Sequence, residues 1–290
     1  MSNVNLIIEE RPARIGSFLV GRLLPFREKR MVGPFAFIDH MGPAELGPDE
    51  NFDVPPHPHI GLSTLTYLFE GSIMHRDSLG SSVEIKPGQV NWMTSGKGIV
   101  HSERTPEHLR PFPKKLHGLQ IWVALPKHLE DMAPSFAHVE AADLPSWTQD
   151  EVEFRLIAGE AFGRKSAVPV YSDLYLIEIK ASKDTQLDLS GKLKGESGLY
   201  ILEGKVSASG HGFGPKQLLV STEPETCGFF MSAGTTVYLF GGEPFPEERF
   251  IYWNFVASEK ETIEKAKQNW RDQTFDKIDG ETEFVPLPER

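Results

Sequence analysis

Most of the chain alternates apolar and polar positions over short runs, which is the pattern of half-buried β-strands. Four such runs, rich in β-branched and aromatic residues, cover 63–69, 118–125, 174–181 and 235–240. Glycine-containing turn signals separate the runs, and the chain holds 26 Gly and 22 Pro. The pattern predicts an all-β protein.

A helical period occurs only near the end of the chain. Ser258 followed by Glu261 fits a capping box, and Ile263 and Trp270 then lie on one stripe. Acidic residues come early in this segment and basic residues late, as the helix dipole favours. We predict one helix over about 259–272.

Two phrases recur in the same order along the chain. YLFEGSI at 67–73 is matched by YILEGKV at 200–206, and MTSG at 93–96 is echoed by MSAG at 231–234. One such match arises easily by chance, whereas two matches at nearly equal offsets favour a duplicated β-domain.

The connection between the two copies should fall in a polar stretch bracketed by prolines. We therefore expect an N-terminal domain over 1–134, a linker over 135–150, and a C-terminal domain over 151–290 that ends in the helix and a tail.

Composition limits the function and the compartment. With 41 acidic and 30 basic residues the formal charge is −11, which disfavours direct binding of nucleic acid. Cys227 is the only cysteine, so no intrachain disulfide can form. We find no apolar run of about 20 residues, no signal-peptide pattern and no basic import cluster. We expect a cytoplasmic protein without a membrane partner; a nuclear location stays open for a eukaryotic source.

Two pairs of potential metal ligands stand well apart along the chain. His57 and His59 form one pair, and His101 and Glu103 form the other after a glycine turn. Residues two apart on a strand point to the same face, so the pairs could face each other across a small β-barrel. Three imidazoles and one carboxylate would leave two positions open on a six-coordinate ion and suit Fe, Mn, Co, Ni, Cu or Zn. The alternative is a proline-rich surface loop that binds no metal.

The second half of the chain lacks a matching ligand set. The offsets of the two repeated phrases carry the first pair onto Ser190 and Lys192 and the second onto Leu239 and Gly241. These residue types do not form a transition-metal site, so we expect metal in the N-terminal domain alone.

The other histidines have simpler interpretations. His128 and His138 are expected on the surface. We interpret His40, His75 and His117 as hydrogen-bonded structural residues, with support of a metal ligand as the alternative.

Six motifs in the N-terminal half indicate a family when they are taken together. They are VGPFAFIDHMGP (32–43), PPHPHIG (55–61), TYLFEG (66–71), HRDSLG (75–80), PGQVNWMTSGKGIVHSE (87–103) and GLQIWVALP (118–126). The set resembles the signatures of the pirin family, in the bicupin branch of the cupin superfamily. The stretch from Gly241 to the helix resembles the family's closing segment more loosely. The resemblance implies two antiparallel jelly-roll β-barrels, with iron in the N-terminal one, and a protein that is often monomeric.

The family's ligand positions fall on the residues that the spacing singles out. They are His57, His59, His101 and Glu103. The chain departs from the general cupin pattern at Ser63, where many cupins have a glutamate. In pirin-like proteins the second motif supplies the acidic ligand, so the resemblance keeps the metal set and puts only the role of the missing glutamate in question.

The resemblance also implies an activity of the quercetin 2,3-dioxygenase type, in which O₂ opens the ring of a flavonol and carbon monoxide is released. The metal would hold the flavonol 3-hydroxyl beside O₂. Glu103 would act as the base for the hydroxyl proton as well as a ligand. Trp92, Met93, Phe35 and Phe37 either line a flat pocket for this aromatic substrate or belong to the barrel core.

Two alternatives need the same metal site. Eukaryotic pirins are nuclear iron proteins that assist transcription factors, and some bacterial ones bind metabolic enzymes. The chain would then be a redox-dependent regulator that acts through a protein partner, which its acidic balance allows. The other alternative is a cupin that binds a small molecule without turnover.

Overall fold

The computed structural model describes residues 4–16, 18–208, 210–222 and 228–288, so Cys227 lies outside the described residues. The described chain is built from β-strands, a few short 3₁₀ turns and one α-helix near its end. The predicted all-β class with a C-terminal helix is confirmed.

The chain folds into two compact units, and each unit draws on separate segments. The N-terminal unit comprises the described residues of 12–20, 38–141 and 246–290, and the C-terminal unit those of 1–11, 21–37 and 142–245. The expected domain limits at 134 and 151 stay a prediction, because the packing units are discontinuous along the chain.

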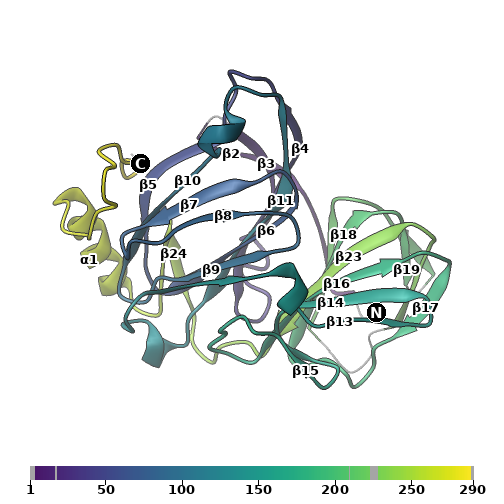
Figure 1. The fold of residues 1–290 in the computed structure, drawn as a ribbon. Helices are drawn as coiled ribbons and strands as arrows, with labels where there is room; N and C mark the ends of the chain where they lie inside the picture. Colours follow the sequence, from purple (N-terminus) through teal and green to yellow (C-terminus); the bar gives the residue numbers. More distant parts are fainter. Residues whose placement is uncertain (1–3, 17, 209, 223–227, 289–290) are drawn as a thin grey trace. The chain divides into compact units, whose positions relative to one another are not determined.

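Two antiparallel sheets supply most of the N-terminal unit (Figure 1), while Arg11, 21–24 and 35–37 at the ends of three of their strands are grouped with the C-terminal unit. The larger sheet has the order β12 (Ser135–Val139), β9 (Val90–Thr94), β6 (Leu62–Glu70), β11 (Lys114–Ala124), β4 (Phe35–Leu46), β3 (Phe18–Leu24) and β2 (Arg11–Ile15). The smaller sheet has the order β5 (Asp53–His59), β10 (Ile99–Arg104), β7 (Ile73–Asp77) and β8 (Ser82–Ile85). Both sheets contribute to one buried apolar cluster, which includes Met41, Val54, Leu68, Ile73 and Leu116. The unit is therefore a two-sheet β-barrel.

The C-terminal unit repeats this design. Its larger sheet has the order β1 (Leu6–Glu9), β21 (Gln217–Ser221), β18 (Glu196–Glu203), β23 (Thr235–Gly242), β16 (Leu174–Ala181), β14 (Val152–Ala161) and β13 (Ser146–Gln149), and β15 (Arg164–Lys165) pairs with β14. Its smaller sheet has the order β17 (Thr185–Asp188), β22 (Gly228–Met231), β19 (Val206–Ala208) and β20 (His211–Phe213). On β16, the alternate residues Tyr175, Ile177 and Ile179 face the core.

The strand orders support the duplication and also correct part of it. Strands β4–β11 hold the same places in their sheets as β16–β23 hold in theirs. The first repeated phrase fits this scheme, because 67–73 joins β6 to β7 and 200–206 joins β18 to β19. The second phrase does not fit, because 93–96 follows β9 whereas 231–234 follows β22, the counterpart of β10.

The strand order corrects the expected counterpart of the second ligand pair, His101 and Glu103. The offset of the second phrase leads from His101 to Leu239 on β23, but the strand in the place of β10 is β22. On β22, Phe229 pairs with Leu187 of β17, and both side chains are buried in the apolar core of the C-terminal unit. The region that holds the histidines in one unit is thus filled with apolar side chains in the other.

The segment expected as a linker contains regular structure. Its first part is β12, which pairs with β9 of the N-terminal unit. Its second part is β13, which pairs with β14 of the C-terminal unit. The 3₁₀ turn Ala141–Asp143 lies between the two strands. The change from one unit to the other therefore falls at about 141–142.

Helix α1 (Lys260–Arg271) confirms the predicted helix, and Ile263, Ala266 and Trp270 are buried as expected. It packs on the hairpin of β24 (Phe250–Tyr252) and β25 (Phe255–Ala257) (Figure 1). The predicted capping box is wrong. The N-cap is Glu259, without a side-chain cap, while the amide and hydroxyl of Ser258 donate to the Glu130 carboxylate at 2.9 and 3.0 Å.

Trp270→Ala should lower the free energy of unfolding by about 3–5 kcal/mol, because a buried Trp leaves a large cavity when truncated. Trp270 is 4% exposed and packs in a cluster with Ile263, Ala266 and Phe255. Chemical denaturation would measure the change. Lys265→Ala, at an exposed position of the same helix, should change stability by only about 0.5 kcal/mol. Equal effects of the two variants would contradict the packing of α1.

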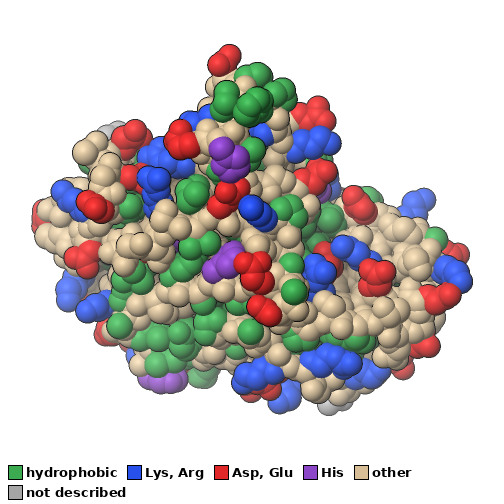
Figure 2. Space-filling model, in the orientation of Figure 1, with side chains coloured by type: hydrophobic (Ala, Val, Ile, Leu, Met, Phe, Trp, Pro, Cys, Tyr) green, Lys and Arg blue, Asp and Glu red, His purple; other side chains and the backbone are tan. Residues whose placement is uncertain are grey.

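Charged side chains of both signs are interspersed on the face shown in Figure 2. Exposed ion pairs join some of them, such as Lys127 with Glu259 at 2.6 Å. Such pairs contribute about 0–1 kcal/mol each, so the stability of the two barrels rests on their buried clusters. Among the described residues, no helix has the length and apolar character needed to cross a membrane.

Candidate metal centre

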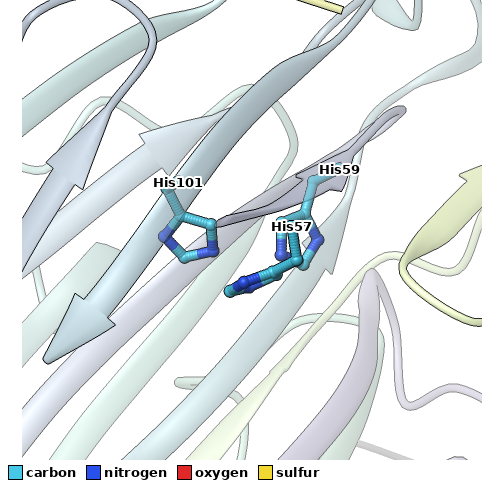
Figure 3. A group of neighbouring side chains, drawn as sticks. All are labelled: His57, His59 and His101. Atoms are coloured by element: carbon cyan, nitrogen blue, oxygen red, sulfur yellow. The ribbon is translucent and has the colours of Figure 1, made fainter. Parts of the chain in front are cut away.

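Three histidines converge inside the N-terminal unit (Figure 3). His57 and His59 lie two residues apart on β5, and His101 is the direct partner of His57 on the antiparallel strand β10. The ring of His101 lies 4.3 Å from that of His57 and 5.0 Å from that of His59, between centroids. One ligand atom from each residue lies within 4.8 Å of those of the other two. The strand alternation therefore brings together three of the four expected ligands.

The hydrogen bonds of the three rings leave one nitrogen of each ring for a metal. Nδ1 of His57 is 2.9 Å from the carbonyl oxygen of Pro55, and donation to that oxygen leaves the Nε2 lone pair free. His59 makes a hydrogen bond with the backbone of Asn254, and its Nδ1 has no partner among the described residues. The same is true of the buried Nε2 of His101. Buried nitrogens are rarely left unpaired, so these atoms fit the ligand set of a transition metal.

Burial keeps these imidazoles in the neutral form that binds metals. Desolvation lowers the pKa of His57 to about 4, against the hydrogen bond to Pro55, which raises it. Desolvation, together with the neighbouring histidines, also lowers the pKa of His59 and His101 well below the ordinary value. No proton has to leave these rings when a metal binds at neutral pH.

The affinity for metal should therefore change little in mildly acidic solution. We expect it to stay level as the pH falls through 6.5 and to decline only as the pH approaches about 4, where a proton competes for the His57 lone pair. A competition titration with a chelator, corrected for the chelator's own protonation, would measure this. A decline centred on 6.5, the value of an unburied histidine, would contradict the neutral buried site.

Glu103 is buried near the histidines but lies outside their group. Among the described residues, the group whose ligand atoms all lie within 4.8 Å contains the three histidines only. The Thr66 hydroxyl is 3.3 Å from the Glu103 carboxylate and 2.9 Å from the Gln120 side-chain oxygen. Burial raises the pKa of Glu103, whereas the neighbouring His75 and the Thr66 hydrogen bond lower it. Its place as a fourth ligand and its role as a base both stay predictions.

His75 and Asp77 extend the site behind His101, a contact that sequence spacing alone did not reveal. Nδ1 of His101 is 3.4 Å from Nδ1 of His75, and Nε2 of His75 is 3.1 Å from Oδ2 of Asp77. If Nε2 of His101 faces a metal, its Nδ1–H donates to His75, and Nε2–H of His75 donates to Asp77. Such a chain fixes the tautomer and the orientation of a ligand. His75 is therefore placed where it could support His101 as a metal ligand, which is the alternative interpretation of this residue.

The other residues that the sequence singled out lie outside the group of three histidines, and most of them make hydrogen bonds of their own. Trp92 is buried and donates Nε1–H to the Thr94 hydroxyl at 3.0 Å. Ser63 shares a buried hydrogen bond with the same hydroxyl at 3.0 Å. His40 and His117 are joined through their Nε2 atoms at 2.8 Å. His128 is exposed as expected, whereas His138 is half-buried, with Nδ1 2.7 Å from the Asn91 side-chain oxygen.

Comparison with known proteins gives the family. The Pirin family model matches residues 18–123, and the model of the pirin C-terminal cupin domain matches residues 176–276. The chain belongs to the pirin family. The second match also agrees with the two-barrel architecture, and the fold is that of a bicupin.

Individual relatives and solved structures match most of the chain. A pirin-like protein from Caulobacter vibrioides is 48% identical over 99% of this chain and 100% of its own length. The crystal structure of a quercetin 2,3-dioxygenase from Acinetobacter baumannii has a TM-score of 0.90 at 36% identity, covering 98% of this chain and 95% of that one. A bacterial pirin from Escherichia coli, in complex with nickel(II), shares the fold with a TM-score of 0.65 at 19% identity, covering 82% and 99%.

Proposed function

We propose that this pirin-family protein binds one divalent transition metal, iron, through His57, His59 and His101, with Glu103 beside them. The observation that supports this most is the convergence of three buried imidazoles, two of which, His59 and His101, have a buried nitrogen without a partner among the described residues. Three neutral nitrogen ligands and a nearby carboxylate suit a first-row metal with positions left for other ligands. The site would belong to the expected N-terminal domain over 1–134.

We propose further that the site opens the ring of a flavonol with O₂, as a quercetin 2,3-dioxygenase does. The bound metal would supply Lewis acidity toward the flavonol 3-hydroxyl and a place for O₂. Glu103, whose pKa burial raises, would accept the hydroxyl proton. Thr66 would hold the Glu103 carboxylate in place through its hydroxyl. The similarity to the Acinetobacter baumannii enzyme supports the choice of substrate class.

Metal analysis of protein purified without an affinity tag would test the first part of the proposal. We expect about one metal ion per chain, and protein without metal would refute the site. Iron-loaded protein with quercetin and O₂ would test the second part, since the flavonol absorption band should disappear as carbon monoxide is released. A metal-replete protein that leaves quercetin unchanged would favour a regulator that acts through a protein partner.

A further inference from the structure

The strand β10 presents two polar side chains, Ser102 and Arg104, on the face opposite the histidines. The Ser102 hydroxyl donates to Oε1 of Glu281 at 2.6 Å. Arg104 donates to Oε2 of Glu281 from Nη2 at 2.8 Å and from Nε at 3.2 Å. The Glu281 side chain is 7% exposed, so this is a charge-assisted contact largely shielded from water. One carboxylate thus holds the two polar outward side chains of the strand that carries His101.

The neighbouring strand β5 has a β-bulge at the level of these contacts. His101 pairs with His57, but Glu103 pairs with Val54, so β5 uses one residue more than β10 between the two pairs. A bulge re-aims side chains and leaves backbone groups outside the ladder. The carbonyl of Pro56, within this bulge, accepts a backbone hydrogen bond from the segment that follows α1. We call this segment, 272–288, the C-terminal tail.

The C-terminal tail is anchored where it crosses the edge strand β5. The amide of Val285 donates to Pro56 at 2.9 Å, and the carbonyl of Val285 accepts the indole N–H of Trp270 at 2.9 Å. Ile278 is buried in the same apolar cluster as Val100, an outward residue of β10. In Figure 1 the tail runs past β5 and α1 on the outer side of the unit. The tail therefore covers the outer side of the two strands whose inner side carries the histidines.

We infer that Glu281 is a positioning residue for the metal centre. The bulge sets where His57 points relative to His101, and the C-terminal tail holds both sides of the bulge, at Pro56 and at Ser102. Without the Glu281 carboxylate, Ser102 and Arg104 lose their shared partner, and the bulge can shift. The inference rests on the proposed metal function. It means that the C-terminal tail slows the release of the metal although it supplies none of the proposed ligands.

The rate of metal release measures this role without any substrate. Wild type would be loaded with Co²⁺ and mixed with excess chelator, and the visible Co²⁺ spectrum would be followed with time. Glu281→Ala should speed release about 10–100-fold, the range for losing a partner that orients a ligand, and should alter the spectrum of the bound ion. Glu281→Gln, which keeps the shape but not the charge, should lie between it and wild type.

Glu283→Gln is the matched control. Glu283 lies on the same tail, 3.6 Å from Arg104, but its side chain is 66% exposed. This variant should release Co²⁺ at the wild-type rate. Wild-type release and an unchanged spectrum in folded Glu281→Ala would overturn the inference and leave the metal function standing. Failure of wild type to bind any metal would instead refute the metal function, and the positioning role with it.

Hydrogen exchange of the metal-free protein adds a second readout. Glu281→Ala should raise exchange at the amides of β10 and β5, because a weaker bulge opens more often. Glu283→Gln should leave these amides as in wild type. If Glu281→Ala proves too unstable to purify, the same comparison with Glu281→Gln decides the question: unchanged exchange would overturn the inference.

Discussion

His57→Ala and His101→Ala should each remove most of the bound metal. Each substitution deletes one of three converging imidazoles, and the remaining two cannot enclose an ion in the same geometry. The loss of affinity should exceed the about 10–100-fold that is typical for losing an orienting partner outside the coordination sphere. Chelator competition and metal analysis of the purified variants would measure it.

Controls for this prediction come from both units. His128→Ala, at an exposed histidine of the same unit, should keep the wild-type metal content. Substitutions at Ser190, Lys192, Leu239 or Gly241 should also leave it unchanged. Full metal occupancy in both histidine variants would contradict the site, and a second ion held by side chains of the C-terminal unit would contradict the asymmetry between the two barrels.

Local sequence patterns predict the four runs that become β6, β11, β16 and β23, because alternation is a property of neighbouring residues. The run 63–69 lies within β6 (Leu62–Glu70), and 174–181 is β16. The helix predicted over 259–272 is α1 within one residue at each end, because an apolar stripe depends only on spacing along the chain. The ligand pairs follow the same rule, since residues two apart on a strand share a face.

Features that depend on distant residues escape this kind of prediction. Ser258 fits a capping box locally, yet its partner is Glu130, which lies 128 residues away in the chain. The repeated phrases indicate a duplication correctly, but only the strand order shows that β22, not β23, corresponds to β10. His75 reaches the site behind His101 because β7 pairs with β10. The distance in sequence between positions 75 and 101 does not predict this contact.

The side chains that replace the histidines in the second barrel also depend on contacts between residues that are distant in the chain. The sequence shows a second copy without ligands, and the structure shows what takes their place: Phe229 and Leu187 pair across β22 and β17 within an apolar core. A core of this kind needs no buried polar atoms, whereas Nδ1 of His59 and Nε2 of His101 are buried without partners in the described part of the chain. Unpaired buried nitrogens cost stability in the metal-free protein, and a bound metal would offset that cost.

Glu103→Gln should separate catalysis from metal binding. Three histidines remain in this variant, so we expect it to keep most of its metal. Gln preserves the size of the side chain and an oxygen that can accept the Thr66 hydrogen bond, but it cannot accept a proton. If Glu103 is the base for the flavonol hydroxyl, quercetin turnover per bound metal should fall by about 10² or more, the scale for losing a general base.

The dependence on pH and a matched variant make the result decisive. Turnover by Glu103→Gln should recover as the pH rises, because a substrate that ionises unaided no longer needs the base. Glu178→Gln replaces a similarly buried carboxylate in the C-terminal unit, where Tyr238 donates to it at 2.6 Å, and should leave turnover per metal unchanged. Wild-type turnover per metal in Glu103→Gln at neutral pH would exclude Glu103 as the base. A large loss of metal in this variant would instead place Glu103 among the ligands, as the family resemblance implies.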